Sequence, residues 1–267
     1  MDPELRERLA QRAEQAQVAP RHQLEPFFKE SAKEVLVALA RNPNLQERDL
    51  LRLLDRKDLP SEVLREVAAH KEAGRNYSIR VALARHPKTP RLVSLPLMKF
   101  LYLFDLVRVC QTPGVPADVK RVAEDNILKR LESVPRGEKI TLARRAPGRV
   151  AAGLLITEDR EVILAALDNP YLSEADLTRT LALEHLPPAA VEVIAVHDRW
   201  CRRYYLRLAL LRNPLTPLAR VLEFLPDLAV NDLRDICLDR RMPEHVRKYV
   251  LAHCVERLAQ KPPPFTG

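Results

Sequence analysis

Two stretches of the sequence, RVALARHPKTPRLVSL at 80–95 and RLALLRNPLTPLARVL at 207–222, share one plan. Each opens with alanines and leucines at helical spacing, reaches a proline after His or Asn, and starts again after a Thr-Pro pair. The residue before a proline is disfavoured in the α region, so a helix must end before each of these prolines. At the restarts, the hydroxyls of Thr89 and Thr216 are predicted to cap the next helix. Both stretches therefore predict two helices joined by a proline turn.

The displacement between these stretches, 127 residues, aligns most of the chain with itself. It pairs twelve of the 22 prolines, and about 30 of the 96 positions in 36–131 are identical to those in 163–258. The identical pairs include Asn42/Asn169, Asp49/Asp176, His70/His197, Arg75/Arg202, Tyr77/Tyr204 and Cys110/Cys237. Self-similarity of this kind is typical of repeat proteins. We therefore predict two tandem, pseudo-equivalent halves.

A shorter period lies inside each half. Pro43 and Pro87 are 44 residues apart, as are Pro170 and Pro214, and this length suits a helical hairpin of HEAT or armadillo size. Short helices with one apolar stripe must stack on neighbours to bury it, and such stacking builds a solenoid. The sequence thus predicts an all-α protein, a right-handed α-solenoid of about ten short, proline-punctuated hairpins or half-hairpins.

The pattern Ala-x-x-Asn-Pro-x-Thr-Pro, an apolar helix and then Pro-x-x-Val-Arg, as in MPEHVR at 242–247, resembles the HEAT-like and leucine-rich-repeat-variant α-solenoids. The 23 residues from Pro147 to Pro170 match the shorter variant unit. The resemblance extends over residues 16–260. It implies a fold and a habit of binding partners, and it supplies no catalytic residues.

Periodicity and composition also suggest domain bounds. LESVPRGEK at 131–139 interrupts the helical pattern and holds one of only six glycines. The predicted organisation is a polar capping helix at 1–13, a first repeat half at 14–133, a junction at 134–140, a second repeat half at 141–260 and a disordered tail at 261–267.

Composition narrows the functional classes. Six glycines against 22 prolines leave little material for phosphate-binding loops, which disfavours a nucleotide-binding enzyme. No run of 18 apolar residues could span a membrane. The start, MDPELRERLAQRAEQ, lacks the apolar core of a secretory signal, so we expect a cytoplasmic location. The formal charge of +8 favours an anionic partner.

Two basic blocks, 75–99 and 199–220, coincide under the 127-residue shift, and each holds six basic residues and no acidic one. Arginine binds phosphates, and tyrosine beside it can stack on bases, as in sequence-tolerant nucleic-acid binding. The residues predicted to bind an anion or a partner are Arg75, Tyr77, Arg80, Arg202, Arg203, Tyr204 and Arg207. In a second interpretation these arginines bridge to neighbouring hairpins, with the duplicated aspartates Asp49, Asp105, Asp176 and Asp232 as available partners.

No Gly-x-Ser-x-Gly elbow is present, and the four cysteines follow no metal-ligand spacing. His197 and Cys201, four apart, are more simply packed side chains than half of a metal site. We expect no cofactor and no metal. The leading hypothesis is a non-enzymatic scaffold that binds a protein or peptide on the concave face of a repeat array. The alternatives are nucleic-acid binding through the basic blocks and an enzyme with its site in the groove.

Overall fold

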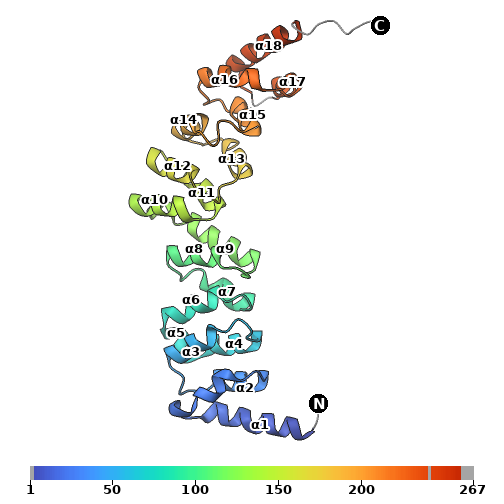
Figure 1. Ribbon diagram of the computed structural model, residues 1–267. Helices are drawn as coiled ribbons and strands as arrows, with labels where there is room; N and C mark the ends of the chain where they lie inside the picture. Colours follow the sequence, from blue (N-terminus) through green and yellow to red (C-terminus); the bar gives the residue numbers. More distant parts are fainter. Residues whose placement is uncertain (1–2, 240–241, 260–267) are drawn as a thin grey trace, which may run out of the picture. The chain divides into compact units, whose positions relative to one another are not determined.

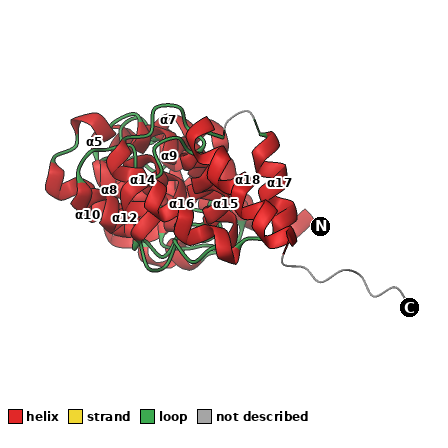
Figure 2. Ribbon diagram, turned by 90° about the horizontal axis from the view of Figure 1, so that it is seen from above, coloured by secondary structure: helices red, strands yellow, loops and turns green. Residues whose placement is uncertain are grey.

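The computed structural model of the chain describes residues 3–239 and 242–259, and every regular element in these ranges is a helix (Figure 2). The prediction of an all-α protein is therefore confirmed. The chain divides into two compact units, residues 1–129 and residues 130–267, which we call unit 1 and unit 2. None of the helices in the described ranges is both long and apolar enough to cross a membrane.

Unit 1 begins with α1 (Pro3–Val18), which extends beyond residue 13, the predicted bound of the capping helix. The helices that follow are short (Figure 1). They are η1 (Arg21–Gln23), η2 (Glu25–Lys29), α2 (Lys33–Ala40), α3 (Glu47–Leu54), α4 (Ser61–Ala69), α5 (Lys71–Arg75), α6 (Tyr77–Arg85), α7 (Arg91–Leu97), α8 (Leu103–Gln111) and α9 (Ala117–Leu128).

Unit 2 contains η3 (Leu131–Ser133), α10 (Arg136–Arg145), α11 (Gly148–Leu154), α12 (Arg160–Leu167), α13 (Glu174–Leu181), α14 (Pro188–Val196), α15 (Tyr204–Arg212), α16 (Leu218–Phe224), η4 (Leu225–Asp227), α17 (Val230–Leu238) and α18 (Glu244–Ala259). The junction predicted at 134–140 differs from the structure, because α10 begins inside it. Pro135, with φ −58° and ψ 149°, has the extended backbone of a residue that precedes a helix. The disordered tail predicted at 261–267 lies outside the described residues.

Stacking of neighbouring hairpins builds the core of each unit. In unit 1, α2 contacts α4, α4 contacts α6, and α6 contacts α8. In unit 2, α11 contacts α13, α13 contacts α15, and α15 contacts α17. Each helix buries its apolar stripe in this way, so that Leu36, Leu39 and Leu83 are buried in unit 1 and Leu177 and Leu211 are buried in unit 2.

A buried asparagine compensates for the hydrogen bond that a proline removes. In a continuing helix the carbonyl of Ala16 would accept from residue 20, but Pro20 has no N–H. The Nδ2 of Asn42 donates to this carbonyl at 2.8 Å and to that of Ala19 at 2.9 Å, while its Oδ1 accepts from the Asn44 N–H at 2.8 Å. One side chain thus joins α1 to the turn between α2 and α3.

The same arrangement recurs 127 residues later, in unit 2. The proline is Pro147, and Asn169 Nδ2 donates to the carbonyls of Ala143 at 2.6 Å and Ala146 at 3.0 Å. Its Oδ1 accepts from the Tyr171 N–H at 2.7 Å. From the sequence these asparagines are predicted only to mark helix ends, whereas in the structure they also bind one hairpin to the next.

Thr89 and Thr216 act at the preceding helix, so the prediction that their hydroxyls cap the next helix is wrong. Thr89 donates to the carbonyl of Leu83 at 2.7 Å, and Thr216 donates to that of Leu210 at 2.6 Å. Each of these carbonyls lies four residues before a proline and lacks its helical donor. The N-cap residue of the next helix is in both cases a proline without a side-chain hydrogen bond.

Candidate functional site

The two predicted tyrosines hold neighbouring hairpins together. Tyr77 Oη, at the start of α6, donates to Asp105 Oδ2 at 2.6 Å and accepts from the Tyr102 N–H at 2.8 Å. Tyr204 Oη, at the start of α15, donates to Asp232 and accepts from the Ala229 N–H at 3.0 Å. Both phenols therefore bind the first turn of a helix in the next hairpin, α8 or α17.

The pKa of Tyr77 is raised to about 12, first by burial and second by its hydrogen bond to the Asp105 carboxylate. A raised folded-state pKa favours the neutral phenol. The resulting stabilisation is fully present below the unfolded-state pKa, about 10, and is lost as the pH rises toward 12. We expect Asp105→Asn to lower this pKa in part, because a neutral amide does not disfavour the phenolate. Spectrophotometric titration, with Tyr77→Phe to identify the signal, measures the change.

A matched control for that titration is Asp235→Asn, which neutralises an exposed carboxylate of α17. This variant should leave the titration of Tyr77 unchanged. An unchanged titration in Asp105→Asn would show that the Tyr77–Asp105 hydrogen bond does not contribute.

Arg207 is engaged inside unit 2. Its Nε donates to the carbonyl of Cys201 at 2.7 Å, its Nη1 donates to Asp227 Oδ2 at 2.6 Å, and its guanidinium lies 5.3 Å from the centroid of the Phe224 ring. Only 17% of its side chain is exposed. Arg212 similarly donates to Asp239 at 3.1 Å. These two arginines bond to acids, but the acids are Asp227 and Asp239 and not the duplicated aspartates expected as partners. Asp105 and Asp232 accept the hydroxyls of Tyr77 and Tyr204 instead.

The other predicted arginines are less engaged. Arg75 is 75% exposed and lies 3.9 Å from Glu72, at the limit of an ion pair. Arg80 has a buried Nε without a hydrogen-bond partner, and its guanidinium lies 5.9 Å from the centroid of the Tyr77 ring. Arg202 and Arg203 are exposed and form no side-chain bond with another residue in the described ranges. The structure thus brings Arg80 close to Tyr77 in unit 1. In unit 2, Arg202, Arg203 and Tyr204 are neighbours because they are consecutive in the sequence.

Sequence reasoning missed a pocket in unit 2. It has a volume of about 440 Å³ and lies between the C-terminal ends of α13 and α15. Leu183 and Leu215, which are 45% and 39% exposed, contribute apolar surface, and Glu184 is at the same site. The other residues of its wall are Thr178, Leu181, Ala182, Ala209, Arg212, Asn213 and Pro214.

The positions equivalent to the two pocket leucines carry charges in unit 1. Arg56 stands in place of Leu183, and it donates to the carbonyls of Phe28 at 2.8 Å and Glu30 at 2.7 Å. Lys88 stands in place of Leu215, and its Nζ lies 3.1 Å from the carbonyl of Asp58. The signal that could have found the pocket is this exchange of two basic residues for two leucines under the 127-residue shift.

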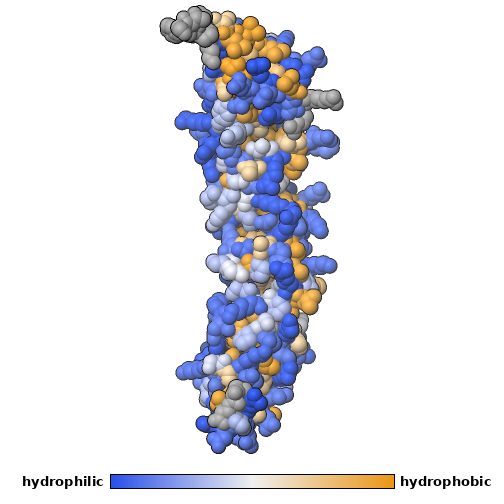
Figure 3. Space-filling model, turned by 90° about the vertical axis from the view of Figure 1, so that its right-hand side faces the viewer, coloured by the Kyte–Doolittle hydropathy of each residue, from blue (hydrophilic) through white to orange (hydrophobic). Residues whose placement is uncertain are grey.

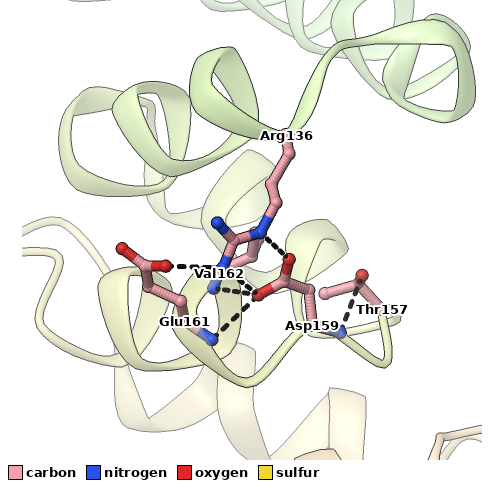
Figure 4. A network of polar contacts seen from close by, with 5 residues as sticks. All are labelled: Arg136, Thr157, Asp159, Glu161 and Val162. Carbon is pink, nitrogen blue, oxygen red and sulfur yellow. Dashed lines mark hydrogen bonds and ion pairs between the residues drawn. The ribbon is translucent and has the colours of Figure 1, made fainter.

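An ionic cluster around Arg136 supports the fold of unit 2 (Figure 4). Arg136, at the start of α10, donates from Nε to Asp159 Oδ2 at 2.5 Å and from Nη2 to Glu161 Oε2 at 2.5 Å. Asp159 in turn caps α12 by accepting from the N–H groups of Glu161 at 3.0 Å and Val162 at 3.3 Å. The hydrogen bond from Arg136 holds the pKa of Asp159 below its usual value. The cluster joins the starts of α10 and α12.

Exposed apolar side chains gather on α18, the last helix described. Leu251, Val255 and Leu258 are 47%, 66% and 50% exposed, and their spacing of four and three places them on one face of the helix. Figure 3 shows apolar surface at the top of the view, where α18 lies. This face is a candidate contact surface of unit 2.

The histidine and cysteine four residues apart have other neighbours in the structure. The Nε2 of His197 lies 3.2 Å from Asp168 Oδ1, and Cys201 is a free, partly buried thiol. In the described ranges, no group of three or more His, Cys, Asp or Glu side chains is arranged to hold a metal ion.

Comparisons of the chain with models of protein families, with curated proteins and with solved structures gave no match.

Proposed function

We propose that the chain is a non-enzymatic scaffold that binds a protein or peptide, and that the pocket between α13 and α15 receives an apolar side chain of that partner. The observation that carries the proposal is the loss of charge at this place in unit 2. In unit 1 the equivalent side chains, Arg56 and Lys88, are bonded to backbone carbonyls, whereas Leu183 and Leu215 leave an open apolar pocket. Open apolar pockets beside a few polar groups are typical binding sites.

Charge at the rim specifies the partner further. Glu184 is exposed and forms no ion pair with another residue of the described ranges, while Arg212 in the pocket wall is already paired with Asp239. A basic side chain of the partner would therefore find a free carboxylate beside the pocket. The proposed ligand is a peptide segment with a bulky apolar residue close to a lysine or arginine.

The finer description of the fold belongs to the same proposal. We infer two pseudo-equivalent halves of a right-handed, HEAT-like α-solenoid, and we place the binding surface on its concave face. Recurrence of the Asn42 and Tyr77 hydrogen bonds at Asn169 and Tyr204 supports a common origin of the two units. Stacked helical hairpins present extended surfaces suited to proteins and peptides.

Nucleic-acid binding through the basic blocks is the weaker candidate, because four of the ten arginines in the two blocks lie within 3.1 Å of an acid of the same unit. These pairs are Arg91–Asp118, Arg207–Asp227, Arg212–Asp239 and Arg220–Glu223. An arginine that already holds a carboxylate must give it up before it can neutralise a phosphate.

A displayed peptide library tests the proposed function. The wild-type protein is expected to select peptides with an apolar residue near a basic one. The double variant Leu183→Arg, Leu215→Lys, which installs the residue types of unit 1, should bind the same peptides at least about 10-fold more weakly, since the pocket loses its apolar wall.

Two further variants test the role of Glu184 and provide a control outside the pocket. Glu184→Gln should reduce the preference for a basic residue. Leu222→Lys changes a leucine that is 44% exposed and is not part of the pocket, and it should leave peptide binding unchanged. Peptides that bind the double variant as tightly as the wild type would refute the pocket as the binding site.

A further inference from the structure

Arg80 and Arg207 occupy equivalent positions but have different partners. Arg207 binds the Asp227 carboxylate at 2.6 Å and the carbonyl of Cys201 at 2.7 Å. In unit 1 the position of Asp227 is taken by Phe100, and Arg80 forms no ion pair with a residue of the described ranges. Its Nε, the atom that bonds the Cys201 carbonyl in Arg207, is buried without an acceptor. Unit 1 therefore holds the arginine without the carboxylate that unit 2 provides for itself.

Tyr77 lies beside Arg80, and two exposed aromatic residues, Phe100 and Tyr102, precede α8. The Tyr77 and Tyr102 ring centroids are 4.6 Å apart, and the guanidinium of Arg80 lies 5.9 Å from the first of them. Tyr102 is 70% exposed and Phe100 is 62% exposed. At the equivalent positions, unit 2 has Ala229 and Asp227. The aromatic side chains are thus a feature of unit 1, beside an arginine that lacks its counter-ion.

The carboxylate that lies in this region is not available to Arg80. Asp105 accepts the hydroxyl of Tyr77 at 2.6 Å and a guanidinium N–H of Arg108 at 3.1 Å. The Nη atoms of Arg80 are not among the buried atoms that lack a partner, so they are the atoms that a ligand carboxylate would bond, as Asp227 bonds Nη1 of Arg207.

We infer that Arg80, with Phe100 and Tyr102, binds an acidic side chain of a partner peptide, in the role that Asp227 has toward Arg207. The guanidinium donates to the carboxylate, and the exposed rings contact apolar residues on either side of it. A carboxylate is favoured over a phosphate because the equivalent arginine holds a carboxylate. The choice of a peptide as its carrier rests on the proposed function. The site itself lies in unit 1, apart from the pocket of unit 2.

The probe is a peptide with the sequence around Asp227, acetyl-LPDLA-amide, and its matched control is acetyl-LPNLA-amide. The measured signal is the ¹⁵N–¹H resonance of the Arg80 Nε, identified by its loss in Arg80→Lys. The aspartate peptide should shift this resonance saturably, and the asparagine peptide should bind about 10-fold more weakly, since it lacks the charge of the carboxylate.

Phe100→Asp is the decisive variant, because it places a carboxylate where unit 2 has Asp227. It should shift the Arg80 resonance without any peptide and abolish the response to the peptide. The fold is checked by circular dichroism, and Phe100→Asn serves as the uncharged control that should leave the Arg80 resonance near its free position.

Three results would overturn the inference. These are equal binding of the aspartate and asparagine peptides, an unchanged response in Phe100→Asp, and saturation by inorganic phosphate at lower concentration than by the peptide. The pocket variant Leu183→Arg, Leu215→Lys should respond to the aspartate peptide as the wild type does. The failure of the pocket proposal and the failure of the Arg80 site are therefore separately visible.

Discussion

Replacing Asn169 with alanine is expected to lower the free energy of unfolding by about 2–4 kcal/mol, because the carbonyls of Ala143 and Ala146 both lose their donor in a buried place. Pro147 cannot replace the asparagine, since it has no N–H. For a unit of this size the loss corresponds to a fall of roughly 6–20 °C in the melting temperature. Thermal and urea unfolding followed by circular dichroism measure it.

The control for this substitution is Asn231→Ala. Asn231 is exposed on α17 and makes no side-chain hydrogen bond to another described residue, so its loss should change stability by less than about 0.5 kcal/mol. If Asn169→Ala unfolded no earlier than Asn231→Ala, the asparagine would only mark the end of a helix, and the link between hairpins would carry no stability.

Replacing Gly148 with alanine should destabilise unit 2 by about 3 kcal/mol, at the upper end of the usual cost of overpacking. A Cβ at this position would lie 2.3 Å from the carbonyl oxygen of Tyr171 and 2.9 Å from Asp176 Oδ2. The nearer atom belongs to the backbone, so relief requires movement of the turn between α12 and α13. Chemical denaturation measures the loss.

Gly137→Ala provides the opposite expectation in the same unit. Gly137 is exposed on α10, and no atom lies within 4 Å of an added Cβ. Alanine favours the helix over glycine, so stability should be unchanged or rise by up to about 1 kcal/mol. Equal effects at Gly137 and Gly148 would contradict the close approach of α11 to the Tyr171 turn.

The helical class could be predicted from local chemistry, because a proline ends a helix wherever the chain goes afterwards. What replaces the hydrogen bond that the proline removes depends on tertiary placement. Thr89 donates to the carbonyl of Leu83 in its own turn, whereas Asn42 donates to the carbonyl of Ala16 from the next hairpin. Both residues adjoin a proline turn in the sequence, and spacing alone does not distinguish these roles.

The candidate site was predicted less well, for a related reason. Arg80 and Arg207 are the same residue at duplicated positions, and their own neighbours in the sequence do not separate them. Their difference comes from the residue twenty positions later, which is Phe100 in one unit and Asp227 in the other. The duplicated residues predict features that the two units share. The functional proposals arise at equivalent positions where the two units have different residues.

The measurement that tests the central claim most directly is the affinity of the best selected peptide for the wild type and for Leu183→Arg, Leu215→Lys, determined by titration calorimetry at one salt concentration. A loss of at least about 10-fold in the double variant, with Leu222→Lys unchanged, is the result expected of an apolar docking pocket. Equal affinities for all three proteins would contradict it.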